Sequence, residues 1–464
     1  MILEASWRES SKLAEGLLPR GVPRATIFVA LGLGLVSFCI HFALSRMLDA
    51  HGAIARINLF FDCDTGWYLE GFESGAGGIG SYGGRGMVHP NVANFVHPPV
   101  MILSKVVGAI GGERAESRAR HALALAVAPL AAATGTAFLF LSLTIAGQSV
   151  GAALLAVALS LASFSGLMFG VLPESFPLTG AIFSFIFYLV SLSARRGEIA
   201  PLPWLIGGTL LFSVTTTNIV PFAMILALTV YVQTRSFESA LRCSGKIVLG
   251  SIALTGALFV LLTAAHGAFG RLSFGGGQLE DLHRPTLEAF WSFPRALMYT
   301  LVPPQPNTLL ASADSEPGEG RRGAVVRFTF RNDLDQIKQD DKAVASTLPA
   351  EGDPVLGAIV IALFLSSVTI ALYNLPRVDG ALKTLFLAAL ALLGFNWIFH
   401  SIFGKELFLY SQHWQVALMV VLSMALVGRS WVGIVGRFSV LLLTLAAAIR
   451  SGMVIHFILS MTGV

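Results

Sequence analysis

The chain has 464 residues, of which 55% are hydrophobic and only 12% are charged. Because soluble globular domains carry charge on about a quarter of their residues, this composition excludes a soluble protein and predicts a polytopic membrane protein. The 31 basic and 27 acidic residues are too evenly balanced to indicate nucleic-acid binding. The three cysteines are scattered without disulfide or zinc spacing, so we expect three free thiols.

Long apolar runs predict an all-α fold in a single domain, 1–464. A helix needs roughly 20 apolar residues to cross a bilayer core about 30 Å thick. The first run, 25–48, follows a basic segment and is too long for a signal-peptide core, so we expect it to be retained as the first span. Further runs predict spans at 97–112, 121–146, 175–194, 246–266, 355–375, 382–403, 411–428 and 436–458.

Basic residues between the runs predict the sidedness. The positive-inside rule places the N-terminus in the cytoplasm, together with clusters at 114–120, 195–196, 235–246, 377–383 and 429–437. Neighbouring clusters must then be separated by an even number of crossings. This parity predicts that 150–172 forms two short helices that cross and return, and that 203–234 breaks at Thr215–Asn218. Broken helices in lipid must be buried in protein or face a wet cavity. The predicted total is about 13 crossings.

Two long polar segments, 49–96 and 267–353, then lie on the same outer side. The first contains a glycine-rich run, 71–86, which is either a plain loop or one that orders on a ligand. The second begins with an amphipathic stretch, 285–304, which is expected to lie along the membrane interface. Residues 311–353 are charged, and we expect them to be irregular.

The first outer segment contains "INLFFDCDTGWYLEGFE", residues 57–73, in which acids stand beside Trp67 and Tyr68. A carboxylate against an aromatic wall is partly desolvated, which makes it a better general base near neutral pH. Asp64 is the first candidate for this role and Asp62 is the second. Two other interpretations stay open: the acids cap a helix that begins near Thr65, or they hold a divalent cation.

The five residues "DTGWY", 64–68, resemble a motif of bacterial relatives of GPI mannosyltransferase type II. An acidic first outer loop after span one also resembles the wider GT-C superfamily of polyprenyl-phosphate-sugar glycosyltransferases. Looser matches are "NFVHPPV" (94–100), "LPES" (172–175) and "KELFLYSQHW" (405–414). The pattern departs from those relatives at residues 69–72, where an isoleucine and an alanine usually stand.

The resemblance implies a GT-C-like enzyme in a bacterial inner membrane, with its active site on the periplasmic face. The implied donor is a polyprenyl-phosphate sugar, and the acceptor is a glycan, a lipid or a protein. By the same resemblance, the first-loop acid, Asp64, deprotonates the acceptor. No P-loop, nucleotide-sugar domain or zinc motif is visible, which also favours a lipid-linked donor.

A departing phosphate needs cationic or hydrogen-bonding side chains. The candidates are Lys405, His413 and Tyr410 on the last outer hairpin and Arg295 in the amphipathic stretch. Lys405 also has a plain interpretation, in which it snorkels at a helix end beside Glu406.

The candidates for contact with the acceptor are Trp67, Tyr68, His89, His97 and Glu174. The prolines after His97 predict that His97 lies at a helix N-terminus. Either histidine could instead ligate a metal with Asp62 and Asp64, and Glu174 could instead cap a helix.

Two other classes of function compete with a transferase. A secondary transporter or lipid-linked glycan flippase would carry ionisable residues near the bilayer midplane. A glycan polymerase or ligase would rely on arginine and histidine in its large outer loop.

Overall fold

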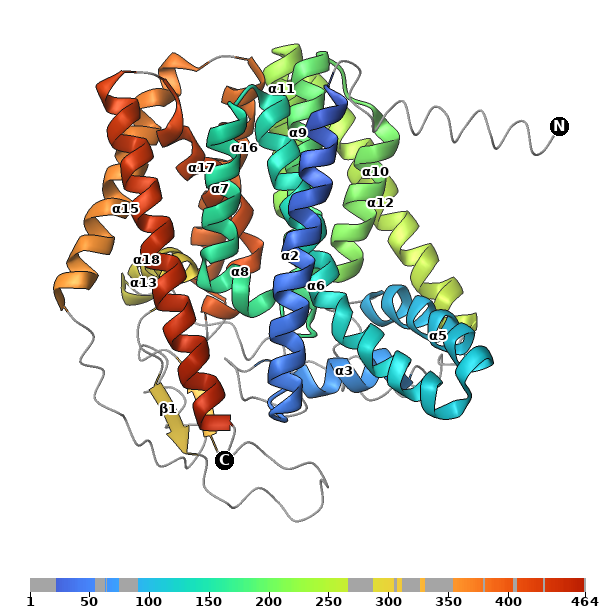
Figure 1. Cartoon of the computed structure of the whole chain (residues 1–464). Coiled ribbons are helices and arrows are strands. Elements are labelled where there is room, and N and C mark those ends of the chain that lie inside the picture. Colours follow the sequence, from blue (N-terminus) through green and yellow to red (C-terminus); the bar gives the residue numbers. More distant parts are fainter. Residues whose placement is uncertain are drawn as a thin grey trace.

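The computed structural model is a helical bundle with a smaller group of elements at one end (Figure 1). It describes residues 22–54, 63, 65–74, 91–265, 287–303, 307–310, 326–329, 354–378, 380–403, 407–428 and 430–462. The helices of the first half are α2 (Arg24–Ala50), α3 (Thr65–Ser74), α5 (Val92–Gly111), α6 (Glu113–Ala146), α7 (Val150–Ala162), α8 (Phe164–Phe169), α9 (Ser175–Arg196), α10 (Pro201–Val214), η2 (Thr216–Asn218), α11 (Ile219–Thr234) and α12 (Phe237–Ala265). The second half has α13 (Leu287–Leu301), α15 (Pro354–Asn374), η6 (Leu375–Arg377), α16 (Gly380–His400), η7 (Leu407–His413), α17 (Gln415–Ser423), η8 (Met424–Leu426) and α18 (Trp431–Thr462).

The membrane class predicted from composition agrees with the helices. Within the described residues, 8 helices are long and apolar enough to cross a membrane, or up to 9 if the bent pair at Leu407–His413 and Gln415–Leu426 counts as one span. The predicted total of about 13 crossings is therefore not confirmed. Shorter apolar helices occupy Phe95–Gly111, Val150–Ala162 and Pro201–Val214.

Both predicted helix breaks are present. Ser163 separates α7 from α8: its backbone is extended, and its hydroxyl accepts a hydrogen bond from Gly166 N at 3.1 Å, which caps α8. Thr215, also extended, ends α10, and the 3₁₀ turn η2 leads into α11. Small hydroxyl and amide side chains can bond to the backbone groups that a break leaves open, so these residues end helices inside an apolar run.

The prediction that Arg114, Arg118 and Arg120 lie on the same side as the N-terminus is wrong. His121, the next residue of α6, contacts Asp49 at the far end of α2 and Glu73 of α3, so this part of α6 lies at the opposite end of α2 from Arg24. α5 therefore does not carry the chain across the bundle. It packs against α3 and α6 and leaves apolar side chains uncovered, among them Ile102, Val106 and Ile110. We call the end of the bundle with α3 and α5 the loop-side end.

The α7–α8 segment makes one passage through the bundle and does not cross and return. Arg195 Nη1 donates to Ile145 O at 3.2 Å, which places the ends of α9 and α6 together. Since α6 and α9 run in the same direction, α7 and α8 must bring the chain back to the loop-side end once. The parity rule failed because it began with arginines 114–120 on the wrong side.

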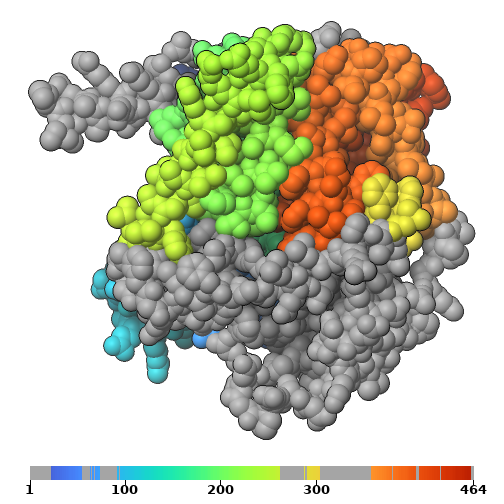
Figure 2. Space-filling view, turned by 180° about the vertical axis from the view of Figure 1, so that it is seen from behind, coloured from blue at the N-terminus to red at the C-terminus, as the bar shows by residue number. Residues whose placement is uncertain are grey.

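The core lies between α6, α9, α16 and α17, where large apolar side chains such as Phe140, Phe187, Leu385 and Met419 are buried. On the back of the molecule, the helices of residues 201–265 lie beside those of residues 354–426, and α13 lies against the latter (Figure 2).

A pair of short strands departs from the all-α prediction. β1 (Asn307–Leu310) and β2 (Val326–Thr329) pair antiparallel, with Asn307 opposite Thr329. β2 lies inside the segment that we expected to be irregular. Its alternation of Val326 and Phe328 with polar residues is typical of a strand, and the pattern is too short to stand out in the sequence.

Candidate functional site

One hydrophobic cluster at the loop-side end joins three parts of the predicted site. It contains Tyr68 and Phe72 of α3, Phe176 of α9 and Phe408 of η7, and Tyr410 packs against it. These residues come from segments up to 340 positions apart in the chain, from 68 to 408. The predicted first-loop, outer-turn and last-hairpin residues thus belong to one packed region.

The η7 turn brings two predicted phosphate-binding side chains together. The rings of Tyr410 and His413 lie 5.9 Å apart, and both contact Phe176, at 5.8 and 6.0 Å. His400, at the end of α16, stacks on Tyr410 at 4.7 Å. His413 and His400 are buried, so this face of η7 is a group of aromatic and imidazole rings packed against the start of α9.

Glu174 lies next to this group, at the N-terminus of α9. Its carboxylate is only 3% exposed and accepts a hydrogen bond from Ser175 N at 2.8 Å. A carboxylate at this position satisfies an open backbone donor and interacts favourably with the helix dipole. The capping interpretation of Glu174 describes this geometry.

α13 crosses the ends of α16 and η7 and presents Arg295. Phe293 packs on Trp414 with ring centres 5.0 Å apart, and Trp414 Nε1 donates to Thr300 Oγ1 at 3.0 Å. Trp397 Nε1 donates to Phe290 O at 2.8 Å. Arg295 is exposed on this anchored helix. The predicted amphipathic helix is therefore present, and aromatic side chains hold it in place.

The residues predicted to contact the acceptor occupy different environments. Tyr68 is buried and packs on Phe72 at 5.9 Å. His97 Nδ1 lies 3.1 Å from Phe72 O, which links α5 to α3. The prediction that His97 lies at a helix N-terminus is wrong, because α5 begins at Val92 and takes both following prolines into its interior.

Several predicted residues fall outside the described part of the chain: Asp62, Asp64, His89 and Lys405, as well as the side chain of Trp67. α3 begins at Thr65, the residue directly after Asp64, where a helix start was expected. No group of three or more potential metal-ligating side chains occurs among the described residues. The roles of these four residues, including a divalent cation held by the acids, stay predictions.

Sequence reasoning missed a histidine held between two carboxylates. His121 Nδ1 lies 2.6 Å from Glu73 Oε1, and His121 Nε2 lies 3.0 Å from Asp49 Oδ2. We call this group the His121 clasp. Burial lowers the pKa of His121, but hydrogen bonds and charge from Asp49 and Glu73 outweigh burial and raise the pKa above 6.5. The clasp was missed because His121 was expected on the other face of the membrane.

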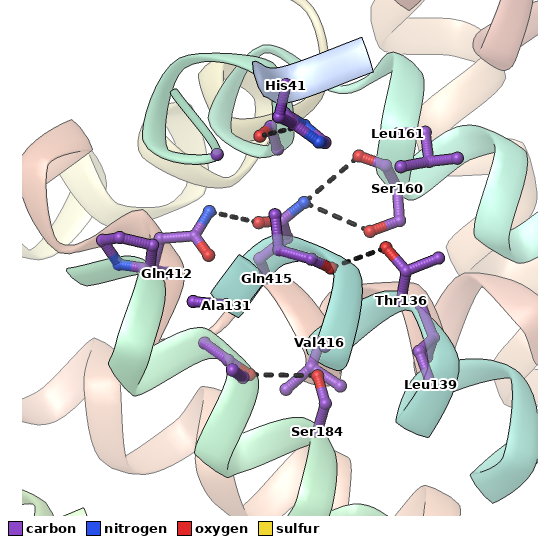
Figure 3. A pocket seen from close by; sticks show the side chains of 17 residues that line it. His41, Ala131, Thr136, Leu139, Ser160, Leu161, Ser184, Gln412, Gln415 and Val416 are labelled. Atoms are coloured by element: carbon purple, nitrogen blue, oxygen red, sulfur yellow. Dashed lines mark hydrogen bonds between the residues drawn. The ribbon is translucent and has the colours of Figure 1, made fainter. Parts of the chain in front are cut away.

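A cavity of about 50 Å³, lined by both polar and apolar side chains, lies within the bundle (Figure 3). Gln412 Nε2 donates to Gln415 Oε1 and to Ser165 Oγ, and Gln415 Nε2 donates to Ser163 Oγ at 2.9 Å. A water needs about 10–15 Å³ of such space, so the cavity has room for a few waters. We call it the glutamine cavity.

His41 forms one wall of the glutamine cavity. It is 1% exposed, with Nδ1 2.7 Å from Ser37 O and Nε2 3.1 Å from Gly166 O. Glycines allow this close packing, because a Cβ on Gly170 would lie 2.2 Å from the His41 ring and one on Gly180 would lie 2.3 Å from Gln412 Oε1. Ser160, Leu161 and Gly166 of the broken α7–α8 segment line this cavity, so the break lies inside protein.

Comparison with known proteins gives no match to a family model, a curated protein or a solved structure.

Proposed function

We propose that this chain is an inverting membrane glycosyltransferase that uses a polyprenyl-phosphate sugar. The observation that supports the proposal is the packing of Tyr68, Phe176 and Tyr410 into one cluster at the loop-side end. Each stands in or beside a sequence motif that matches the GT-C pattern, and Arg295 is carried on a helix anchored at the same end. Residues that handle one substrate must converge, whatever their separation in sequence.

In this proposal Asp64 accepts the proton of the acceptor hydroxyl, with Asp62 as the second candidate. The hydroxyl oxygen attacks the anomeric carbon, the bond from that carbon to the phosphate oxygen breaks, and its electron pair leaves with the lipid phosphate. Arg295, Lys405, His413 and Tyr410 stabilise that phosphate. A single displacement leaves no covalent intermediate, so the anomeric configuration inverts.

Transfer assays on purified protein in lipid nanodiscs test the proposal, with radiolabelled polyprenyl-phosphate sugars as donors and a cell-envelope extract as acceptor. General-base catalysis contributes about 10²–10⁴-fold, so Asp64→Asn or Asp62→Asn should lower turnover by at least about 100-fold. Donor retention, measured by native mass spectrometry, should not change. Glu238→Gln, which removes an exposed carboxylate on α12, is the matched control. Full turnover in both aspartate variants would exclude the proposed base.

A secondary transporter or flippase is the second candidate, and His41 is the observation that favours it. An ionisable side chain inside a transmembrane bundle often marks a transport path. His41 is buried in α2 and lines the glutamine cavity. Flux into proteoliposomes tests transport. If His41→Gln abolishes this flux and Asp64→Asn leaves it intact, transport is favoured over sugar transfer.

A further inference from the structure

The His121 clasp joins three separate elements at the loop-side end. Asp49 stands one residue before the end of α2, Glu73 lies in the last turn of α3, and His121 lies in α6. The first nine residues of α6, 113–121, include six titratable side chains, so this part of α6 lies outside the apolar portion of the span. α3 is 10 residues long, and it begins at Thr65, the residue directly after Asp64.

The two contacts of His121 require a particular protonation state. A neutral imidazole has one N–H, whereas an ionised carboxylate only accepts hydrogen bonds. Both ring nitrogens face carboxylate oxygens, at 2.6 and 3.0 Å, so the protonated ring alone satisfies both contacts. The raised pKa of His121 agrees with this geometry.

Other charged groups near the clasp already have partners. On α2, Arg46 lies 3.4 Å from the same carboxylate oxygen of Asp49. On α6, Arg120 pairs with Glu116 one turn before the clasp. On α5, His97 contacts the backbone of α3 at Phe72. On α3, Glu70 is exposed. His121 is thus the cation placed between Asp49 and Glu73.

We propose that His121 is a positioning residue that holds α3 against α2 and α6 while its ring is protonated, and so sets the position of the first-loop acidic motif. This inference rests on the proposed function, because α3 begins at the residue that follows the proposed base Asp64. His97 contributes a second link to α3 that is independent of the clasp. Loss of the clasp therefore loosens α3 without releasing it.

The clasp is predicted to weaken as the pH rises. Because the pKa of His121 is raised in the folded protein, the hold is complete below about pH 6.5 and is lost as the pH rises through the raised value. Above that value the protonated fraction falls about tenfold for each pH unit. Activity is therefore expected to fall on the alkaline side of the pH profile, and we call this fall, which deprotonation of His121 causes, the alkaline limb.

Three variants test this limb in the transfer assay. His121→Gln cannot carry charge, so it should be several-fold less active than wild type at pH values below the raised pKa of His121, chiefly through kcat, and should match wild type at alkaline pH. His121→Arg is always charged and presents donors to both carboxylates, so it should keep activity and lose the alkaline limb. His51→Gln removes an exposed histidine at the same end whose Nδ1 lies 2.8 Å from Met47 O of its own helix, and it should behave like the wild type.

Hydrogen exchange of the α3 amides separates this inference from the proposed function, because it needs no substrate. At one pH near 7, α3 should exchange at least several-fold faster in His121→Gln than in wild type, and His121→Arg should restore protection. Equal exchange of the α3 amides in wild type, His121→Gln and His121→Arg would overturn the proposed role of the clasp. Restored protection in a chain that transfers no sugar would leave the clasp standing and reject the transferase.

Discussion

His41 and His121 make the same kind of contact in two different surroundings. Each ring has both nitrogens close to oxygen atoms. For His121 these are carboxylates near the polar end of the bundle, and for His41 they are two backbone carbonyls and the Ser37 hydroxyl, which can donate to a neutral ring. Carboxylates can offset an imidazolium charge, whereas carbonyls only accept hydrogen bonds. The described lining of the glutamine cavity contains no acid, so a charge on His41 would have no opposite charge there.

The two regions therefore differ in what holds them together. The glutamine cavity depends on shape and on neutral hydrogen bonds among buried groups, which are costly to disturb. The His121 clasp depends on charge between side chains that are 18–35% exposed, where water and salt weaken the interaction. Substitutions should therefore have large effects on stability at the cavity and small ones at the clasp.

The largest effect is expected from Gly170→Ala. The added Cβ would lie 2.2 Å from the His41 ring and 2.7 Å from Gly166 O, so the ring and the α8 backbone must move. Overpacking of this kind costs about 1–3 kcal/mol, and we expect the upper end of that range. Thermal unfolding in detergent measures it. Gly151→Ala, with open space around the new Cβ, should leave the melting temperature unchanged or higher.

Gln415→Leu should have the next largest effect. The change removes one donor to Ser163 Oγ and one acceptor of Gln412 Nε2, although Ser163 Oγ keeps Gly166 N and Gln412 Nε2 keeps Ser165 Oγ. Each lost hydrogen bond costs about 0.5–1.5 kcal/mol, so we expect a loss near 2 kcal/mol. Gln233→Leu is the matched control: Gln233 Nε2 is buried with no hydrogen-bond partner in the described structure, so its replacement should be neutral. Equal losses would contradict the role given to the cavity network.

The smallest effect on stability is expected from His121→Gln, and it should depend on pH and salt. The ion pairs are partly exposed, so the loss should be less than about 1 kcal/mol at pH 6. The difference from wild type should shrink as the pH rises through the raised pKa of His121, because wild type then loses the same charge. Unfolding of wild type and variant at about 0.1 and about 1 M salt measures how strongly salt screens the ion pairs of His121. A loss that is independent of pH would show that His121 acts by packing alone.

The sequence predicted much of the secondary structure and little of its assembly. Apolar run length predicted the long helices, and the hydroxyl and amide side chains at Thr215–Asn218 predicted a break that η2 confirms. The amphipathic pattern predicted α13. The position of α5 could not be predicted in this way, because a helix that lies beside α3 and α6 and one that crosses a membrane both need apolar residues.

Composition and run length by themselves determined that this is a membrane protein of long helices, because the bilayer demands apolar length and internal hydrogen bonding whatever the fold. Only the tertiary structure decided which polar side chains meet. Asp49, Glu73 and His121 come from three elements, as do His41, Ser165 and Gln412, and the contacts of these residues join helices across separations of 48 to 247 residues. Such packing follows from shape and close approach at glycines, which no local pattern in the chain records.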